Sequence, residues 1–168
     1  MEGSGVADAS LLLSLGEATA LHLLWEDPGW TWHVTPIARG EVRRDPTRSE
    51  LSHAILAGRL AATELDTDSE EELRLFAHWS DVVDPGEAEA IAVALARGWV
   101  VGLEDLFAQR CVTRQAGEAH WVNAAGLLLR ATHAGRMSIA DADAVFVRLD
   151  CYSGYRKRGI SSLRNLSP

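Results

Sequence analysis

The sequence predicts an α/β protein, a three-layer α/β/α sandwich in which a parallel sheet lies between two layers of helices. Short apolar runs of strand length alternate along the chain with longer segments of helical periodicity, and the connections between them are short. This alternation is typical of a parallel sheet with helices on both faces. The 168 residues, of which 47% are hydrophobic and 24% charged, suffice for one core, so we expect one main domain.

The first half of the chain predicts two short strands separated by helical segments. Residues 6–7 form an apolar run that ends in a carboxylate, and apolar residues then recur at helical spacing over residues 10–24. Proline and glycine interrupt this helix, and residues 32–35 are predicted to be extended. Residues 41–65 show helical periodicity in two parts, which Pro46 separates.

The second half begins with the acidic run 66–72, which predicts a loop and a helix start with Asp68 or Ser69 as the N-cap. Residues 73–79 are predicted to be a short amphipathic helix or partly extended. Residues 84–97 predict a helix that a glycine ends. The remaining predicted elements are a buried strand at 99–103, a helix at 105–116, a short strand at 121–123 and helices at 125–135 and 140–149.

No internal repeat or long linker divides the chain. We expect a flexible N-terminus at residues 1–5, one domain at 6–150 and a tail at 151–168. The tail contains no acidic residue and four basic ones, Arg156, Lys157, Arg158 and Arg164. A basic tail is usually solvated, but it can also contact the phosphates of an RNA strand.

Composition excludes several classes of protein. The net charge of −8 argues against binding nucleic acid through a broad basic surface, although a metal-dependent nuclease needs carboxylates. Cys111 and Cys151 form no CxxC pair, and the sequence has no GxGxxG, P-loop, GxSxG or HExxH motif. With neither an apolar stretch of membrane-spanning length nor a signal sequence, we expect a cytoplasmic protein without a membrane segment.

Carboxylates stand where predicted strands end. Asp8 ends the first strand, Glu104 and Asp105 follow the strand at 99–103, and Glu41 comes shortly after the second extended segment. In parallel sheets, ligands bind beyond the carboxyl ends of the strands, and Mg²⁺ prefers oxygen ligands. Each acid also has a structural explanation: Asp8 as an N-cap, Glu104 and Asp105 as favourable charges at a helix start, and Glu41 as a surface residue.

Two glutamates near the start of the helix at 84–97 have different expected surroundings. Asp84 followed by Glu87 three positions later resembles a capping box, which would explain Glu87 by local structure. The residues three, four and seven positions after Glu87 are apolar and mostly small, so Glu87 is predicted to stand at the buried edge of the sheet. Glu89 points about 200° away from Glu87, and we expect it to be solvated.

Five segments, in this order, match motifs of one protein family: VADASLLLSL, PIARGEV, DPGEAEAIAVALARG, VVGLEDLFAQR and NAAGLLLRATHAGRM. They cover most of residues 5–150. By these motifs the sequence resembles a PIN domain, and more specifically the PIN-like subgroup related to the toxin ribonucleases of toxin–antitoxin pairs. The resemblance implies a PIN-like α/β/α sandwich with the activity of a Mg²⁺- or Mn²⁺-dependent ribonuclease.

The resemblance also implies a set of site residues. The catalytic acids would be Asp8, Glu41, Glu87 and Glu104, with Asp105 beside the last as a metal ligand, so that the metal site comprises Asp8, Glu87, Glu104 and Asp105. The implied partners are single-stranded RNA, a second copy of the chain and an antitoxin protein that occupies the site.

The substrate contacts are expected from one hydroxyl and the tail. Ser10 falls at the small hydroxyl position two residues after the first acid, and Arg156, Lys157 and Arg158 would contact RNA phosphates.

Three positions depart from the family pattern. Glu104 stands where the family commonly has Asp, Leu106 replaces a frequent basic residue, and Asn123-Ala124 replaces Gly-Thr. The departures favour an alternative, a non-catalytic PIN-like module that binds RNA or protein. A third interpretation is an α/β domain in which all of these acids are helix caps.

Overall fold

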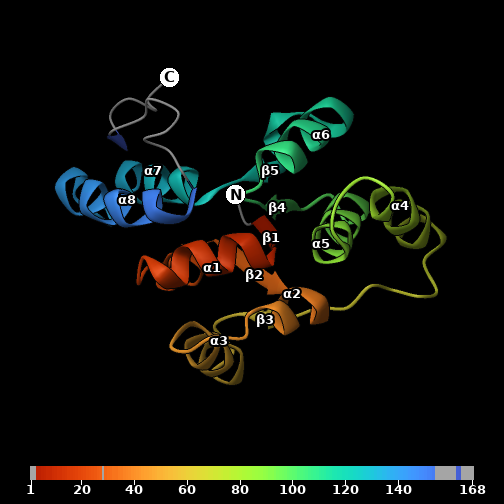
Figure 1. Cartoon of the computed structure of the whole chain (residues 1–168), viewed down its shortest axis with the longest axis horizontal. Coiled ribbons are helices and arrows are strands. Elements are labelled where there is room, and N and C mark those ends of the chain that lie inside the picture. Colours follow the sequence, from red (N-terminus) through yellow and green to blue (C-terminus); the bar gives the residue numbers. More distant parts are fainter. Residues whose placement is uncertain (1–2, 28, 154–161, 164–168) are drawn as a thin grey trace.

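A five-stranded sheet in the order β3-β2-β1-β4-β5, with every neighbouring pair parallel, forms the centre of the protein (Figure 1). The computed structural model describes residues 3–27, 29–153 and 162–163, and for residues 118 and 150–153 the backbone alone. The strands are β1 (Gly3–Ala7), β2 (Trp30–Val34), β3 (Ala61–Ala62), β4 (Val100–Gly102) and β5 (Trp121–Val122). The predicted fold class is therefore confirmed.

Helices connect the strands and cover the sheet. The α-helices are α1 (Ala9–Glu17), α2 (Pro36–Glu41), α3 (Thr47–Leu56), α4 (Glu70–Ser80), α5 (Pro85–Ala96), α6 (Leu106–Ala116), α7 (Ala124–His133) and α8 (Ile139–Ser153). Two short 3₁₀ helices complete the described elements, η1 (Leu21–Leu24) and η2 (Glu118–His120). Among the described residues no helix has the length and apolar character needed to cross a membrane.

The alternation of side chains along β1 gives the sheet two buried faces. Val6 packs in a core with α4, α5 and α6, whereas Ala7 packs in a second core with α1, α7 and α8. Figure 1 shows these two groups of helices on opposite sides of the strands. With both faces covered, β4 (Val-Val-Gly) and the end of β1 (Gly-Val-Ala) carry no polar side chain, whereas β2 retains Thr31 and His33.

The sheet begins earlier than the sequence predicted. Residues 3–5, expected to belong to a flexible N-terminus, pair in register with Trp30 to Trp32 of β2. A Cβ atom at Gly5 would lie 2.7 Å from the buried ring of Trp32, so glycine here makes room for the indole. The glycine-rich start was therefore wrongly interpreted as a flexible segment, because its glycines accommodate tryptophans of the neighbouring strand.

The helix predicted over residues 10–24 is divided in two. Thr19 has a φ of 53°, its N–H donates to the carbonyl of Gly16, and the N–H of Ala20 donates to that of Leu15. These two bonds form a Schellman motif, which ends α1 with threonine in the position usually taken by glycine.

The segments between β2 and α5 differ in two further ways from the prediction. The first helix of this region, α2, covers Pro36–Glu41 and so ends where the predicted helical segment begins, because Thr35 caps it by accepting from the N–H of Ala38. The short strand β3 was not predicted. Residues 73–79 are entirely helical, within α4, which confirms the first of the two predicted alternatives. The N-cap of α4 is Ser69, one of the two predicted candidates.

Candidate functional site

The carboxyl ends of β1 and β4 lie side by side at the centre of the sheet, where the N–H of Asp8 donates to the carbonyl of Gly102 at 3.0 Å. From β1 the chain continues to β2 on one side, and from β4 it continues to β5 on the other. Connections that leave in opposite directions open a crevice above the strand ends, which is where parallel α/β sheets bind ligands. Asp8 follows β1 directly, and Glu104 lies two residues after the last residue of β4, so both predicted acids stand at these strand ends.

Asp8 is both a helix cap and a buried charge. It is 1% exposed, and its Oδ2 accepts from the N–H of Ser10 at 3.0 Å and from the Ser10 hydroxyl at 2.7 Å. Its Oδ1 is buried and has no hydrogen-bond partner in the described part of the chain. Burial raises the pKa of Asp8 above its usual 3.8, and it outweighs the hydrogen bonds from Ser10 and the backbone N–H of Ala9, which lower it; the negative charge of Asp84 adds a smaller upward contribution. The capping interpretation is correct, but it accounts for only one of the two carboxylate oxygens.

Ser10 connects the two strand ends. Its hydroxyl donates to Asp8 and accepts from the backbone N–H of Glu104 at 3.1 Å. The hydroxyl proton is thereby committed to Asp8, so in this structure Ser10 orients the acid. Contact with a substrate, which the resemblance implied for Ser10, stays a prediction.

Glu87 lies half-buried in the first turn of α5, as its apolar neighbours on the helix predicted. Burial raises its pKa from 4.5 to about 7, and the charges of Asp8, Asp105 and Asp84 add to the shift. The predicted capping box is not complete, because the Asp84 side chain makes no cap hydrogen bond. The Asp84 backbone N–H lowers the pKa of Glu87, but burial and the charges of the three other acids outweigh it.

Glu41 reaches the same field from α2. A Cβ atom at position 86 would lie 2.7 Å from its Oε1, which places the Glu41 carboxylate directly against Gly86 in the first turn of α5. Burial raises the pKa of Glu41, the charges of Asp8 and Asp84 raise it further, and Arg43 opposes them. Glycine at position 86 is what allows this close approach.

The two acids after β4 are both engaged by helix starts. Glu104 Oε1 accepts from the N–H of Ala124 at 2.6 Å, at the beginning of α7. Asp105 caps α6 by accepting from the N–H of Ala108 at 2.8 Å, and its charge also acts on Glu87. Asn123, which with Ala124 replaces the Gly-Thr of the family pattern, caps α7: its side-chain oxygen accepts from the N–H of Gly126. Leu106 is 37% exposed at the start of α6.

Together these acids form what we call the acidic edge, defined as Asp8, Glu41, Asp84, Glu87 and Asp105. Asp84 was predicted only as a cap, and its position one residue before a helix-starting proline gave no sign that its charge would act on three other acids. Across the described residues, no three His, Cys, Asp or Glu side chains are grouped so that they could hold a metal ion. The carboxylates of the acidic edge thus act on one another through their charges, but in the described residues they are not arranged as a ready-made set of metal ligands.

Glu89 contradicts the prediction that it would be solvated. It is 7% exposed, and its Oε2 accepts from the backbone N–H of Ile37 at 3.2 Å. The predicted rotation away from Glu87 directs Glu89 towards the first turn of α2, whose N–H groups have no partner within the helix. Both sides of α5 are buried, so pointing away from one buried side does not lead to solvent.

Replacing Glu89 tests this contact. Glu89→Leu would leave the Ile37 N–H without its acceptor, and we expect a loss of about 1–3 kcal/mol in the free energy of unfolding, measured by urea denaturation. Glu89→Gln retains an acceptor oxygen and is the matched control, with a smaller expected loss. Equal stability of Glu89→Leu and the native chain would show that the contact contributes nothing.

The predicted substrate contacts Arg156, Lys157 and Arg158 lie outside the described residues, so their role stays a prediction. No family model matches the chain, and no curated protein and no solved structure gives a significant match. The resemblance to PIN domains consequently rests on the five sequence segments.

Proposed function

We propose that the protein is a divalent-cation-dependent endoribonuclease that hydrolyses phosphodiester bonds of single-stranded RNA at the acidic edge. The observation that supports this most is the buried Oδ1 of Asp8, which has no partner among the described residues and lies in the field of other carboxylates. Repulsion among acids and burial of an unpaired charge both disfavour folding, and such arrangements concentrate at functional sites.

The donor set suits a hard cation such as Mg²⁺ or Mn²⁺. These ions take oxygen ligands and are commonly held by one or two carboxylates, with water and substrate oxygens completing the coordination. Asp8 and Glu87 would hold the ion, because one has an unpartnered oxygen and the other is half-exposed with a raised pKa. When bound, the cation would lower the pKa of water and stabilise negative charge on the phosphate.

Residues of the chain would fix the geometry of this site. Ser10 holds the orientation of Asp8 through two hydrogen bonds, and Gly86 allows Glu41 to approach the start of α5. Glu41, Asp84 and Asp105 would contribute negative charge around the ligands. In this proposal the other partners are a second copy of the chain and an antitoxin that covers the acidic edge, and the protein acts in the cytoplasm.

A non-catalytic PIN-like module that binds RNA or protein is the second candidate. It is favoured by the position of Glu104, whose carboxylate accepts from the start of α7, and by the capping role of Asp105. In that case the fold would be kept while Glu104 and Asp105, two of the four predicted metal ligands, are held by the starts of α7 and α6. Binding of RNA without cleavage is the result expected of such a module.

Cleavage of single-stranded RNA tests the proposal. With Mg²⁺ or Mn²⁺ the native chain is expected to cleave, and addition of a chelator should stop the reaction. Asp8→Asn and Glu87→Gln are expected to lower the rate about 100-fold or more, since each removes a charge that would hold the cation.

The matched control is Glu71→Gln, which removes one charge from an exposed position on α4 and should cleave like the native chain. Equal cleavage by native, Asp8→Asn and Glu87→Gln chains would contradict the enzyme proposal. Absence of cleavage by the native chain with either metal would also contradict it, and RNA binding would then favour the second candidate.

A further inference from the structure

A pocket of about 730 Å³ opens beside the acidic edge, between α2, α3 and the carboxyl ends of β2 and β3. Its lining includes three arginines, Arg39 on α2, Arg43 after it and Arg48 on α3, together with Thr63 and Glu64 beyond β3. We call it the arginine pocket. It lies at the same edge of the sheet as the acids, because all five strands are parallel.

The charge of the arginine pocket is opposite to that of the chain. Three guanidinium groups face one carboxylate, Glu64, in a protein whose net charge is −8. All three arginines are exposed, and none forms an ion pair with any other residue that the structure describes. Arg43 donates to the carbonyl of Gly40 at 3.4 Å, which leaves most of its donors available. Guanidinium groups in this state are suited to phosphate oxygens.

Helix α2 separates the arginine pocket from the acidic edge. Arg39 and Gly40 line the pocket, whereas the next residue, Glu41, places its carboxylate against Gly86 of α5. The charge of Arg43 also acts on Glu41, so the positive and negative regions adjoin along a single short helix. A polyanion bound at the acidic edge would therefore have these arginines next to it.

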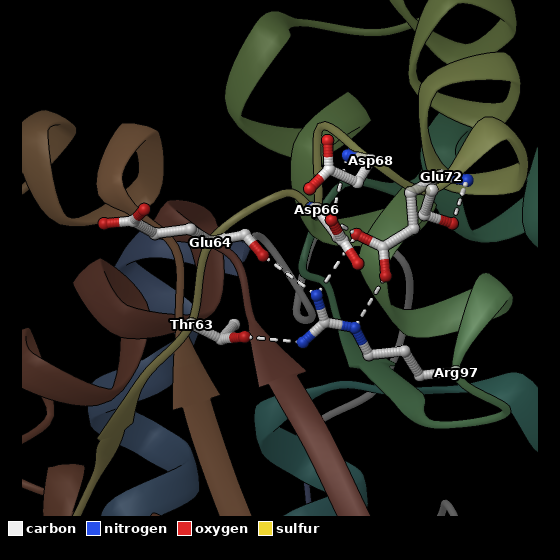
Figure 2. A network of polar contacts seen from close by, with 7 residues as sticks. Thr63, Glu64, Asp66, Asp68, Glu72 and Arg97 are labelled. Carbon is white, nitrogen blue, oxygen red and sulfur yellow. Dashed lines mark hydrogen bonds and ion pairs between the residues drawn. The ribbon is translucent and has the colours of Figure 1, made fainter.

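Arg97 fixes the segment of Thr63 and Glu64, which forms one wall of the pocket. Figure 2 shows its guanidinium reaching from the end of α5 to Thr63, Glu64 and Glu72. It donates to the hydroxyl of Thr63 at 2.7 Å and to the carbonyl of Glu64 at 2.9 Å, and it pairs with Glu72 at 2.7 Å. The segment that lines the pocket is thereby fixed to α5, the helix that also carries Glu87.

We infer that the arginine pocket binds phosphate groups of the single-stranded RNA whose scissile bond lies at the acidic edge. The identity of the strand as substrate rests on the proposed function, whereas phosphate binding rests on the pocket itself. Arg39, Arg43 and Arg48 would offset the repulsion between RNA and the carboxylates and would fix the register of the strand. Phosphate contacts of this kind position a nucleic acid without reading its sequence.

Binding measured without cleavage tests the inference. Fluorescence anisotropy with a labelled single-stranded RNA, in chelator, would compare the native chain with an Arg39→Gln, Arg43→Gln, Arg48→Gln triple variant. At low salt the triple variant is expected to bind at least about 10-fold more weakly. The dependence of log affinity on log salt concentration should become less steep: the magnitude of its negative slope should decrease by about 2, which is about 0.7 for each of the three lost phosphate contacts.

The matched control is an Arg74→Gln, Arg110→Gln, Arg114→Gln triple variant, which makes the same charge change at exposed positions on α4 and α6. It should retain native affinity and slope. Equal weakening in both triple variants, or no binding by the native chain, would overturn the inference. If the native chain binds RNA through these arginines but cleaves none with either metal, the ribonuclease proposal fails and the arginine pocket stands.

Discussion

At pH 7.5, in chelator, the Asp8→Asn variant is expected to melt about 5 °C above the native chain. Burial raises the pKa of Asp8, which means that the ionised carboxylate is less favourable in the folded than in the unfolded state. Asparagine is neutral and retains an oxygen that accepts from Ser10. An unsatisfied buried polar group typically costs about 1–3 kcal/mol, and relief of a cost of this order would account for the shift in a chain of 168 residues.

The contribution of Asp8 and Glu87 to the stability of the folded chain becomes more unfavourable as the pH rises. At low pH, Asp8 and Glu87 are protonated in both states and the acidic edge has no electrostatic penalty. As pH rises above 3.8 for Asp8 and 4.5 for Glu87, the unfolded state ionises first and the native chain loses stability. For Glu87 this loss is complete above its folded pKa of about 7. The advantage of Asp8→Asn and Glu87→Gln over the native chain should therefore grow between pH 4.5 and 7.5.

Thermal melts across this pH range, with and without Mn²⁺, provide the measurement. Asp81→Asn is the control, because it removes a charge from an exposed position at the end of α4 and should follow the native pH dependence. Mn²⁺ should raise the melting temperature of the native chain, since a ligand that binds the folded state stabilises it, and should have less effect on Asp8→Asn. If Asp8→Asn melts below the native chain at every pH, the cap hydrogen bonds of Asp8 stabilise the fold more than its buried charge destabilises it. The acidic edge would then not lower the stability of the folded chain.

Part of this site was predictable because strand ends and helix starts carry local signals. Asp8 ends an apolar run, and the apolar face behind Glu87 places it at the sheet, as the structure confirms. The prediction that Glu89 is solvated was wrong. Helical periodicity gives the direction of Glu89 relative to Glu87, but it does not show which element lies in that direction. There the structure places α2, a helix that lies about fifty residues earlier in the chain.

The arginine pocket could not be found from the sequence for a related reason. Arg39, Arg43 and Arg48 stand among other basic residues, and nothing local distinguishes them. They line one pocket because α3 follows α2 closely and β3 pairs with β2, and β3 has only two residues, Ala61 and Ala62. A strand so short has no detectable alternation, so the position of Thr63 and Glu64 depends on tertiary contacts alone.

The largest loss of stability is expected from Arg97→Leu. Glu72 is 4% exposed, and Arg97 is its ion-pair partner, while the same guanidinium stacks over Trp99 at 5.1 Å and holds Thr63 and Glu64 (Figure 2). Removal of one partner leaves a buried charge uncompensated, which typically costs about 3–5 kcal/mol. We expect urea denaturation to show a loss of this order and the melting temperature to fall by about 10 °C.

A second substitution separates the buried charge from the lost contacts. Glu72 Oε2 also accepts from the N–H of Asp66 at 2.7 Å, and Gln at position 72 would keep that acceptor without the charge. The Arg97→Leu, Glu72→Gln double variant should therefore regain part of the stability lost in Arg97→Leu. RNA affinity is expected to be weaker in Arg97→Leu and to stay weaker in the double variant, because Thr63 and Glu64 lack the guanidinium that fixes them in both. A double variant as unstable as Arg97→Leu would show that packing and hydrogen bonds, rather than the orphaned carboxylate, account for the loss.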